Sequence, residues 1–296
     1  MSRSFVVAPL LVALLAAAGS SYGVFPGRNG RIAFVRAVLD SDNQPVSRDV
    51  YSVDPNGTGL RNLTPGSRDQ FWPAWSADGK RIVYVEADGA SGLDISGYEL
   101  WTMNADGSRK RRLTSNAAAD QQPAWSPDGK WIVFSRRTGH GNFDLAVIRA
   151  NGGRVRLLTR TNDLDELLPT WAPDGRRIAY LLAPRVDALT SRAGYYVLTV
   201  RTGRVQRVAL DLGLDARPTW TPRGRLSITR AAWSPDGRLR LVANPQGPDA
   251  IARRIEIENP DGSLSRVVTK SVYPLDDYDP TWQPLPRRKA GGASVP

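Results

Sequence analysis

Hydrophobic and polar positions alternate in short runs along most of the chain. Runs rich in Val, Ile and aromatic residues occur at 31–35, 81–85 and 131–134, and each follows a polar turn that contains glycine. Short apolar runs of this kind, separated by turns rich in Gly and Pro, are typical of β-strands in antiparallel sheets. The pattern therefore predicts an all-β protein.

One phrase recurs through the chain: Pro-x-Trp, then an Asp-Gly turn, then an apolar strand. It occupies 73–84, 123–134 and 169–180, returns in part at 218–224, and ends as Pro-Thr-Trp at 280–282. Its tryptophans, which recur after 50, 46, 49 and 62 residues, are Trp75, Trp125, Trp171, Trp220 and Trp282. A period near 40–50 residues is typical of the blades of a β-propeller.

Each repeat can be divided into four strands. In the first repeat the tryptophan strand is followed by runs at 81–85, 99–103 and 111–114, with an Asn-Ala-Asp-Gly turn between the last two. Asn-Gly, Asp-Gly and related dipeptides at the equivalent turns favour tight hairpins. We therefore expect four-stranded antiparallel blades.

The two ends of the repeat region are complementary. Residues 28–64 supply strands two to four without a preceding Pro-x-Trp strand, and residues 280–282 supply that strand alone. Pairing the last strand into the first blade closes the ring and removes an exposed sheet edge. We predict five blades, the first closed by both ends and the others starting near Trp75, Trp125, Trp171 and Trp220. A second copy of the phrase at Trp233 is interpreted as an extra hairpin, and six blades is the alternative.

The start of the chain resembles an export signal. Arg3 precedes an apolar run at 5–18, and small residues follow at 16–21. The run is shorter than the ~18 residues that span a bilayer. We expect a signal peptide at 1–23, a propeller domain at 24–285 and a disordered polar tail at 286–296, with a retained membrane anchor as the alternative. The mature protein is then exported without spanning the membrane, and is periplasmic, cell-wall-associated or extracellular.

The amino-acid composition excludes several kinds of catalytic and metal site. The chain has no cysteine and one histidine, which excludes disulfides, thiol catalysis, iron–sulfur clusters and multi-histidine metal centres. A net charge of +11 favours anionic partners such as cell-wall polymers, although arginine scattered over every repeat also fits a general bias for that residue. Export disfavours a nucleic-acid partner.

The repeated phrase Pro-x-Trp-Ser-Pro-Asp-Gly-Lys-x-Ile-x-Phe resembles the WD-like repeat of TolB-type β-propellers. The resemblance covers residues 28–284 and implies the propeller fold. TolB itself carries an α/β domain before its propeller, whereas this chain passes from the signal almost directly to the first blade. The partner binding of that domain is therefore not carried over.

The repeated tryptophans are expected to pack in the core, and the repeated Asp78, Asp128, Asp174 and Asp236 to stabilise their turns. The segment before each Pro-x-Trp is more informative, because in propellers it opens onto the mouth of the central channel. An acid recurs there in every repeat, either as a binding group or as a turn cap. The predicted binding residues are Asp69, Gln70, Trp72, Asp120, Gln121, Asp165, Glu166, Asp215, Arg217, Asp277 and Tyr278.

Two functional classes follow from this pattern. The first is a non-enzymatic exported propeller that binds an envelope protein, a peptide or a glycan at the channel mouth. The second is a hydrolase or lyase that acts on a polysaccharide or lactone through a cation bound in the channel. No catalytic residue is identified, and no cofactor is expected other than that cation.

Overall fold

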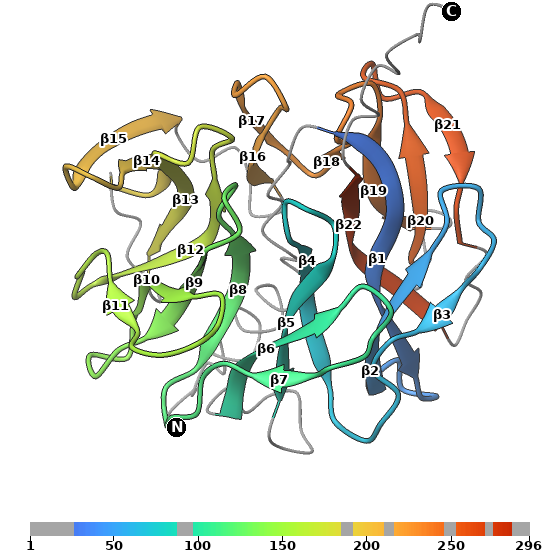
Figure 1. Ribbon diagram of the computed structural model, residues 1–296, viewed down its shortest axis with the longest axis horizontal. Helices are drawn as coiled ribbons and strands as arrows, with labels where there is room; N and C mark the ends of the chain where they lie inside the picture. Colours follow the sequence, from blue (N-terminus) through green and yellow to red (C-terminus); the bar gives the residue numbers. More distant parts are fainter. Residues whose placement is uncertain are drawn as a thin grey trace, which may run out of the picture.

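The computed structural model describes residues 27–87, 97–184, 192–209, 216–245, 253–269 and 275–285. Every element of regular structure in these residues is a β-strand (Figure 1). The predicted signal peptide and the predicted polar tail lie outside the described residues. In the part of the chain that is described, no helix is long and apolar enough to cross a membrane.

Five four-stranded antiparallel sheets form the blades. Blade 1 has the spatial order β22 (Leu275–Leu285), β1 (Arg28–Leu39), β2 (Pro45–Val53) and β3 (Arg61–Asn62). Blade 2 contains β4 (Gln70–Trp75), β5 (Arg81–Ala87), β6 (Tyr98–Asn104) and β7 (Arg111–Arg112). Blade 3 contains β8 (Asp120–Trp125), β9 (Trp131–Arg137), β10 (Phe143–Arg149) and β11 (Arg156–Leu157).

Blade 4 contains β12 (Leu164–Trp171), β13 (Arg177–Pro184), β14 (Gly194–Thr199) and β15 (Arg204–Ala209). A two-stranded hairpin follows, made of β16 (Arg217–Trp220) and β17 (Leu226–Thr229). Blade 5 contains β18 (Ala232–Trp233), β19 (Arg240–Pro245), β20 (Arg253–Glu258) and β21 (Leu264–Val267).

The prediction of five four-stranded blades and an extra hairpin is confirmed, but the hairpin lies elsewhere in the chain than expected. The Trp220 strand pairs only with β17 among the described strands, and the fifth blade begins at Trp233. The short spacing between these two tryptophans explains the difference, because it leaves room for one turn and one returning strand.

The first strand of each blade lies innermost, and these strands form a closed ring. Around the ring β22, β4, β8, β12, β16 and β18 each contact the next, and β18 contacts β22 again (Figure 1). Closure depends on β22, which pairs antiparallel with β1 from Arg28 opposite Leu285 to Val38 opposite Leu275. The predicted closure of the ring by a C-terminal strand in the first blade is thus confirmed.

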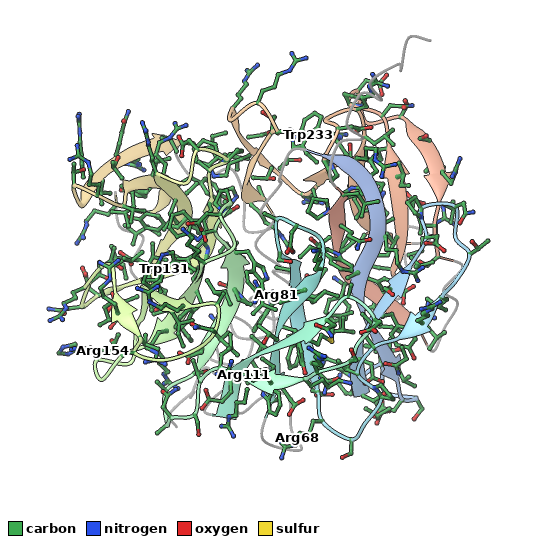
Figure 2. All side chains as sticks on the ribbon, viewed as in Figure 1. Arg68, Arg81, Arg111, Trp131, Arg154 and Trp233 are labelled. Atoms are coloured by element: carbon green, nitrogen blue, oxygen red, sulfur yellow. The ribbon has the colours of Figure 1, made fainter. Side chains whose placement is uncertain are left out.

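The repeated tryptophans lie between blades. Trp75, Trp125, Trp171, Trp220 and Trp282 are at most 5% exposed. The Trp125 indole N–H donates to the Ala74 carbonyl of the preceding blade at 3.1 Å, and the Arg81 guanidinium lies 4.5 Å above the Trp125 ring (Figure 2). Each tryptophan therefore joins an apolar interface that fixes the angle between adjacent blades.

The Asp-Gly turns close the first hairpin of each repeat. In blade 3, Asp128 accepts hydrogen bonds from the Ser126 hydroxyl at 2.6 Å and from the Lys130 N–H at 3.1 Å. Gly129 supplies the left-handed conformation with a φ of 67°. Burial acts to raise the pKa of Asp128, but these hydrogen bonds and the Lys130 charge outweigh it and lower the pKa below its ordinary value. Asp78, Asp174 and Asp236 accept the equivalent backbone N–H at 3.1, 2.8 and 3.0 Å.

Candidate binding site at the channel mouth

The predicted binding residues lie at the start of the inner strands. Gln70 and Asp120 begin β4 and β8, and Arg217 begins β16. The predicted residues of blades 4 and 1, which lie within β12 and β22, are Asp165, Glu166, Asp277 and Tyr278. Equivalent residues of successive repeats occupy one end of the ring because all inner strands share one direction. Asp215 lies outside the described residues.

Two of these carboxylates are held by an arginine on the neighbouring strand of the same blade. Asp120 and Arg136 face each other across β8 and β9 and form two hydrogen bonds of 2.7 Å. Asp277 and Arg36 repeat the arrangement across β22 and β1, at 2.6 and 2.7 Å. Both carboxylates are fully buried, and bidentate pairing of this geometry compensates their lost hydration.

Other carboxylates at this end pair with arginines from neighbouring parts of the ring. Asp69 binds Arg48 of blade 1 at 2.5 Å. Two acids that the sequence analysis did not select behave in the same way: Asp276 binds Arg253 of blade 5 at 2.7 Å, and Asp279 lies 3.6 Å from Arg217 of the hairpin. The repulsion expected among clustered acids is therefore relieved by the chain's own guanidinium groups.

In all of these pairs except Arg48–Asp69 the arginine is the more exposed partner. The Arg36 and Arg136 side chains are 11% and 19% exposed, whereas their carboxylate partners are at 0%. Burial acts to lower the pKa of Arg36, but the hydrogen bonds and charge of Asp277 outweigh it and raise that pKa. Apart from the Arg48–Asp69 pair, the guanidinium groups rather than the acids are thus nearer to solvent at this end of the ring.

The acids of blade 4 bind backbone groups instead. Asp165 accepts the Phe143 N–H at 2.8 Å, and Glu166 accepts the Leu145 N–H at 3.1 Å together with the Thr159 hydroxyl. Burial raises the pKa of Glu166 to about 7, because desolvation outweighs these two hydrogen bonds and the nearby Asp144 charge adds to it. These two acids stabilise backbone N–H groups of β10 in the preceding blade, rather than N–H groups of their own turn.

The predicted aromatic and amide residues are buried. Trp72 is 2% exposed and packs against the rings of Phe71 and Tyr98 at 5.4 and 5.8 Å. Tyr278 is 6% exposed beneath the Arg253 guanidinium, 4.9 Å from the ring centre, and burial raises its pKa. Gln121 is 5% exposed. None of the three forms an open aromatic or amide wall in the described part of the chain.

Four inner strands of the ring share an unusual backbone conformation. The residue before the repeated proline has a left-handed conformation in four inner strands, with φ of 49° at Trp72, 55° at Gln122, 54° at Leu168 and 53° at Asp279. Each of these side chains is at most 2% exposed. The Gln122 side-chain oxygen accepts the Leu168 N–H at 2.8 Å, which links blades 3 and 4. These four side chains are therefore buried at the level of the inner strands.

Sequence reasoning selected Arg217 but missed the other arginine partners, although two of these carry a local signal. Arg36 and Arg136 each follow an aromatic residue by two positions on the second strand of a blade, as Phe34-x-Arg36 and Phe134-x-Arg136. Each guanidinium lies 5.5 Å from the centre of that ring. Arg48, Arg253 and Asp276 carry no such local signal, because their partners lie in another blade.

A small pocket opens beside one predicted residue. It has a volume of about 230 Å³ and is lined by residues 64–68 with Gln70, Glu86 and Lys110. Arg68 forms a salt bridge of 3.1 Å with Glu86 across it. Gln70 is 2% exposed, and its side-chain oxygen accepts no hydrogen bond from the described residues. We call this the mouth pocket. Within the described residues, no group of three or more His, Asp or Glu side chains is arranged to hold a metal ion.

No family model matches the sequence. The Tol-Pal system protein TolB of Alcanivorax borkumensis is 32% identical over 83 residues, which are 28% of this chain and 18% of that protein. Dipeptidyl-peptidase 5 of Porphyromonas gingivalis is 33% identical over 52 residues, which are 18% of this chain and 8% of that protein. The matched segments thus span less than a fifth of either relative.

Among solved structures, a chain of the nidogen/laminin complex aligns with a TM-score of 0.63 at 10% identity, covering 87% of this chain and all of that chain. Identity at this level supports the fold alone. The structure thus shows a closed five-bladed β-propeller, and its repeats are similar to those of TolB-type propellers.

Proposed function

We propose that this chain is an exported, non-enzymatic β-propeller that binds a protein, peptide or glycan of the cell envelope at the channel mouth. The observation that carries the proposal is that the described carboxylates at that end of the ring are held by arginines or backbone N–H groups. Proton transfer and metal coordination both need an accessible carboxylate, and a carboxylate that is already paired is not accessible. Carboxylates fixed in this way instead keep a binding face rigid.

The mouth pocket beside Gln70 offers a place for a ligand group. Arg68 is half exposed there, and Lys110 and Gln70 line the same pocket. Two cationic side chains beside an amide favour an anionic or hydroxyl-bearing group of the partner. Envelope polymers and acidic protein surfaces both carry such groups, and export of the chain through its first 23 residues would bring it to them.

The experiment compares capture by three forms of the purified protein. Immobilised wild type is exposed to the solubilised envelope fraction, and bound material is identified by mass spectrometry and carbohydrate analysis. The test variant carries Arg68→Glu and Lys110→Glu, and the control carries Arg154→Glu, a charge reversal elsewhere on the surface (Figure 2). We expect one partner to be retained by wild type and control and reduced about tenfold on the test variant. Equal retention by all three forms would refute binding at the mouth pocket.

A further inference from the structure

The hairpin leaves one face of blade 4 uncovered. In blades 2 and 3 the third-strand residue that faces the next blade is buried, as Thr102 at 7% and Val147 at 2% exposure show. The equivalent residue of blade 4 is Val197, which pairs with Ala179 in the same register and is only partly buried. The next unit in the ring is the two-stranded hairpin, so within the described residues no third or fourth strand of a neighbouring blade covers β14 and β15 on this side (Figure 1).

The hairpin also presents an open strand edge. The Thr221 N–H donates to the Arg225 carbonyl, so this pair is hydrogen-bonded. Two residues further along each strand Thr219 faces Ser227, which is the next hydrogen-bonded pair. Alternation in an antiparallel pair then directs the backbone groups of Leu226 and Ile228 away from β16. Among the described residues no strand pairs with β17 on that side.

A groove runs between this edge and blade 4. Its volume is about 350 Å³, and its walls combine apolar and basic side chains. Val197, Val208, Trp220 and Leu226 supply the apolar surface, and Arg177 and Arg204 lie among them. Val208 on β15 remains 42% exposed. An extended chain placed along β17 would cover this surface.

Basic residues predominate around the groove, where the acid Asp174 is already paired with the lining Arg177 at 2.8 Å. The described residues 192–209 and 216–230 contain eight arginines and no Asp or Glu. Arg204 and Arg225 form no salt bridge with any described residue. Figure 2 shows nitrogen-tipped side chains projecting from β15 and from the hairpin. A partner that binds here must therefore supply negative charge.

We propose that an acidic, extended peptide segment of a partner protein adds to β17 as a third strand. Its backbone pairs with Leu226 and Ile228, and its apolar side chains cover Val197 and Val208 in the groove. Because side chains alternate along a strand, its carboxylates lie on the opposite face, next to Arg225, while the charge of Arg204 at the groove wall adds to the attraction for the acidic segment as a whole. Such strand addition obtains affinity from backbone hydrogen bonds and specificity from alternate side chains. This surface is separate from the mouth pocket. The chain's own segment at 286–296 does not fit the groove, since it carries Arg287, Arg288 and Lys289 and no acid.

The first test uses a labelled peptide of alternating Glu and Val, seven residues long, titrated with the full-length protein and followed by fluorescence anisotropy. The control peptides replace Glu by Lys, or the central Val by Pro. We expect saturable binding of the acidic peptide alone, weakened about tenfold or more in Arg204→Glu with Arg225→Glu. The Arg68→Glu and Lys110→Glu variant keeps full peptide affinity, because its changes lie at the mouth pocket.

The second test isolates the backbone contact. Ile228→Pro removes an N–H that β16 does not use, and Ile228→Ala removes the same side chain but keeps that N–H. We expect about tenfold weaker peptide binding for the proline variant, relative to the alanine variant, at matched melting temperatures. Amide exchange of Leu226 and Ile228 should be fast in the free protein and slow with peptide.

Three outcomes would overturn the proposal. The first is equal affinity for the acidic and lysine peptides. The second is equal affinity of the Pro and Ala variants. The third is slow exchange of the Leu226 and Ile228 amides in the free protein, which shows that the edge is already occupied, with concentration-dependent self-association identifying a second copy as the occupant.

Discussion

Trp282 offers the sharpest perturbation of ring closure. It lies on β22 opposite Ile32 of β1 and is 4% exposed. Its cluster contains Ile32 and Phe34 of blade 1 together with Leu241 and Ile255 of blade 5. Trp282→Ala therefore removes the side chain that packs the closing strand of blade 1 against the last blade.

The expected cost follows from burial. Truncation of a buried tryptophan to alanine costs ~3–5 kcal/mol, a large share of the ~5–15 kcal/mol that stabilises a typical domain. For a protein of this size each kcal/mol lowers the melting temperature by ~2–4 °C, so the variant should melt about 6–20 °C below wild type. The Trp282 indole N–H has no hydrogen-bond partner among the described residues. Trp282→Phe therefore loses no hydrogen bond and should cost about 1–2 kcal/mol.

Urea unfolding followed by far-UV circular dichroism measures these differences directly. The matched control is Trp131→Ala, since Trp131 is only half buried and lies on β9, away from the closing strand (Figure 2). Hydrogen exchange should show faster exchange of β1 and β22 amides in Trp282→Ala than in the control. A Trp282→Ala protein that is no less stable than Trp131→Ala would refute closure as the stabilising contact.

Three further predictions concern the turns and the buried charges. A Cβ on Gly79 would lie 2.2 Å from the Pro284 carbonyl oxygen of β22, whereas a Cβ on Gly129 meets nothing within 4 Å at nearly the same φ. Gly79→Ala should thus lower the melting temperature well beyond Gly129→Ala, which carries only the ~1 kcal/mol conformational cost; equal shifts would contradict the contact. Asp120→Asn leaves the Arg136 charge without its carboxylate and should cost ~3–5 kcal/mol in urea unfolding, while Asp120→Leu with Arg136→Met restores most of it. The folded pKa of Glu166, about 7, lies above the value of an unfolded chain, so wild type loses stability as the pH rises from about 4.5 to 7. Glu166→Gln should therefore gain up to ~3 kcal/mol relative to wild type above pH 7 and little at pH 4, and a gain independent of pH would contradict this assignment.

Much of the architecture is determined by local sequence. The Asp-Gly turn needs only an aspartate that accepts a nearby N–H and a glycine with positive φ, so it can be recognised in each repeat without knowledge of the fold. The spacing of Pro-x-Trp sets the blade size, and the strand missing at one end matches the strand left over at the other. These features predicted the closed ring and the number of four-stranded blades, because each depends on residues close together in the chain or on a simple count.

Tertiary structure determines which carboxylates at the channel mouth are paired with arginine. The sequence shows an acid before each Pro-x-Trp, but Arg48, Arg217 and Arg253 reach these acids from other parts of the ring. The same holds for the hairpin: two equally good tryptophan phrases lie close together, and only packing selects which one begins a full blade. Whether a carboxylate is free or neutralised depends on which side chains lie within about 3 Å of it, and that distance is set by contacts between blades. The repeat pattern therefore determined the ring, and the packing of the ring determined which charges and edges remain open to a partner.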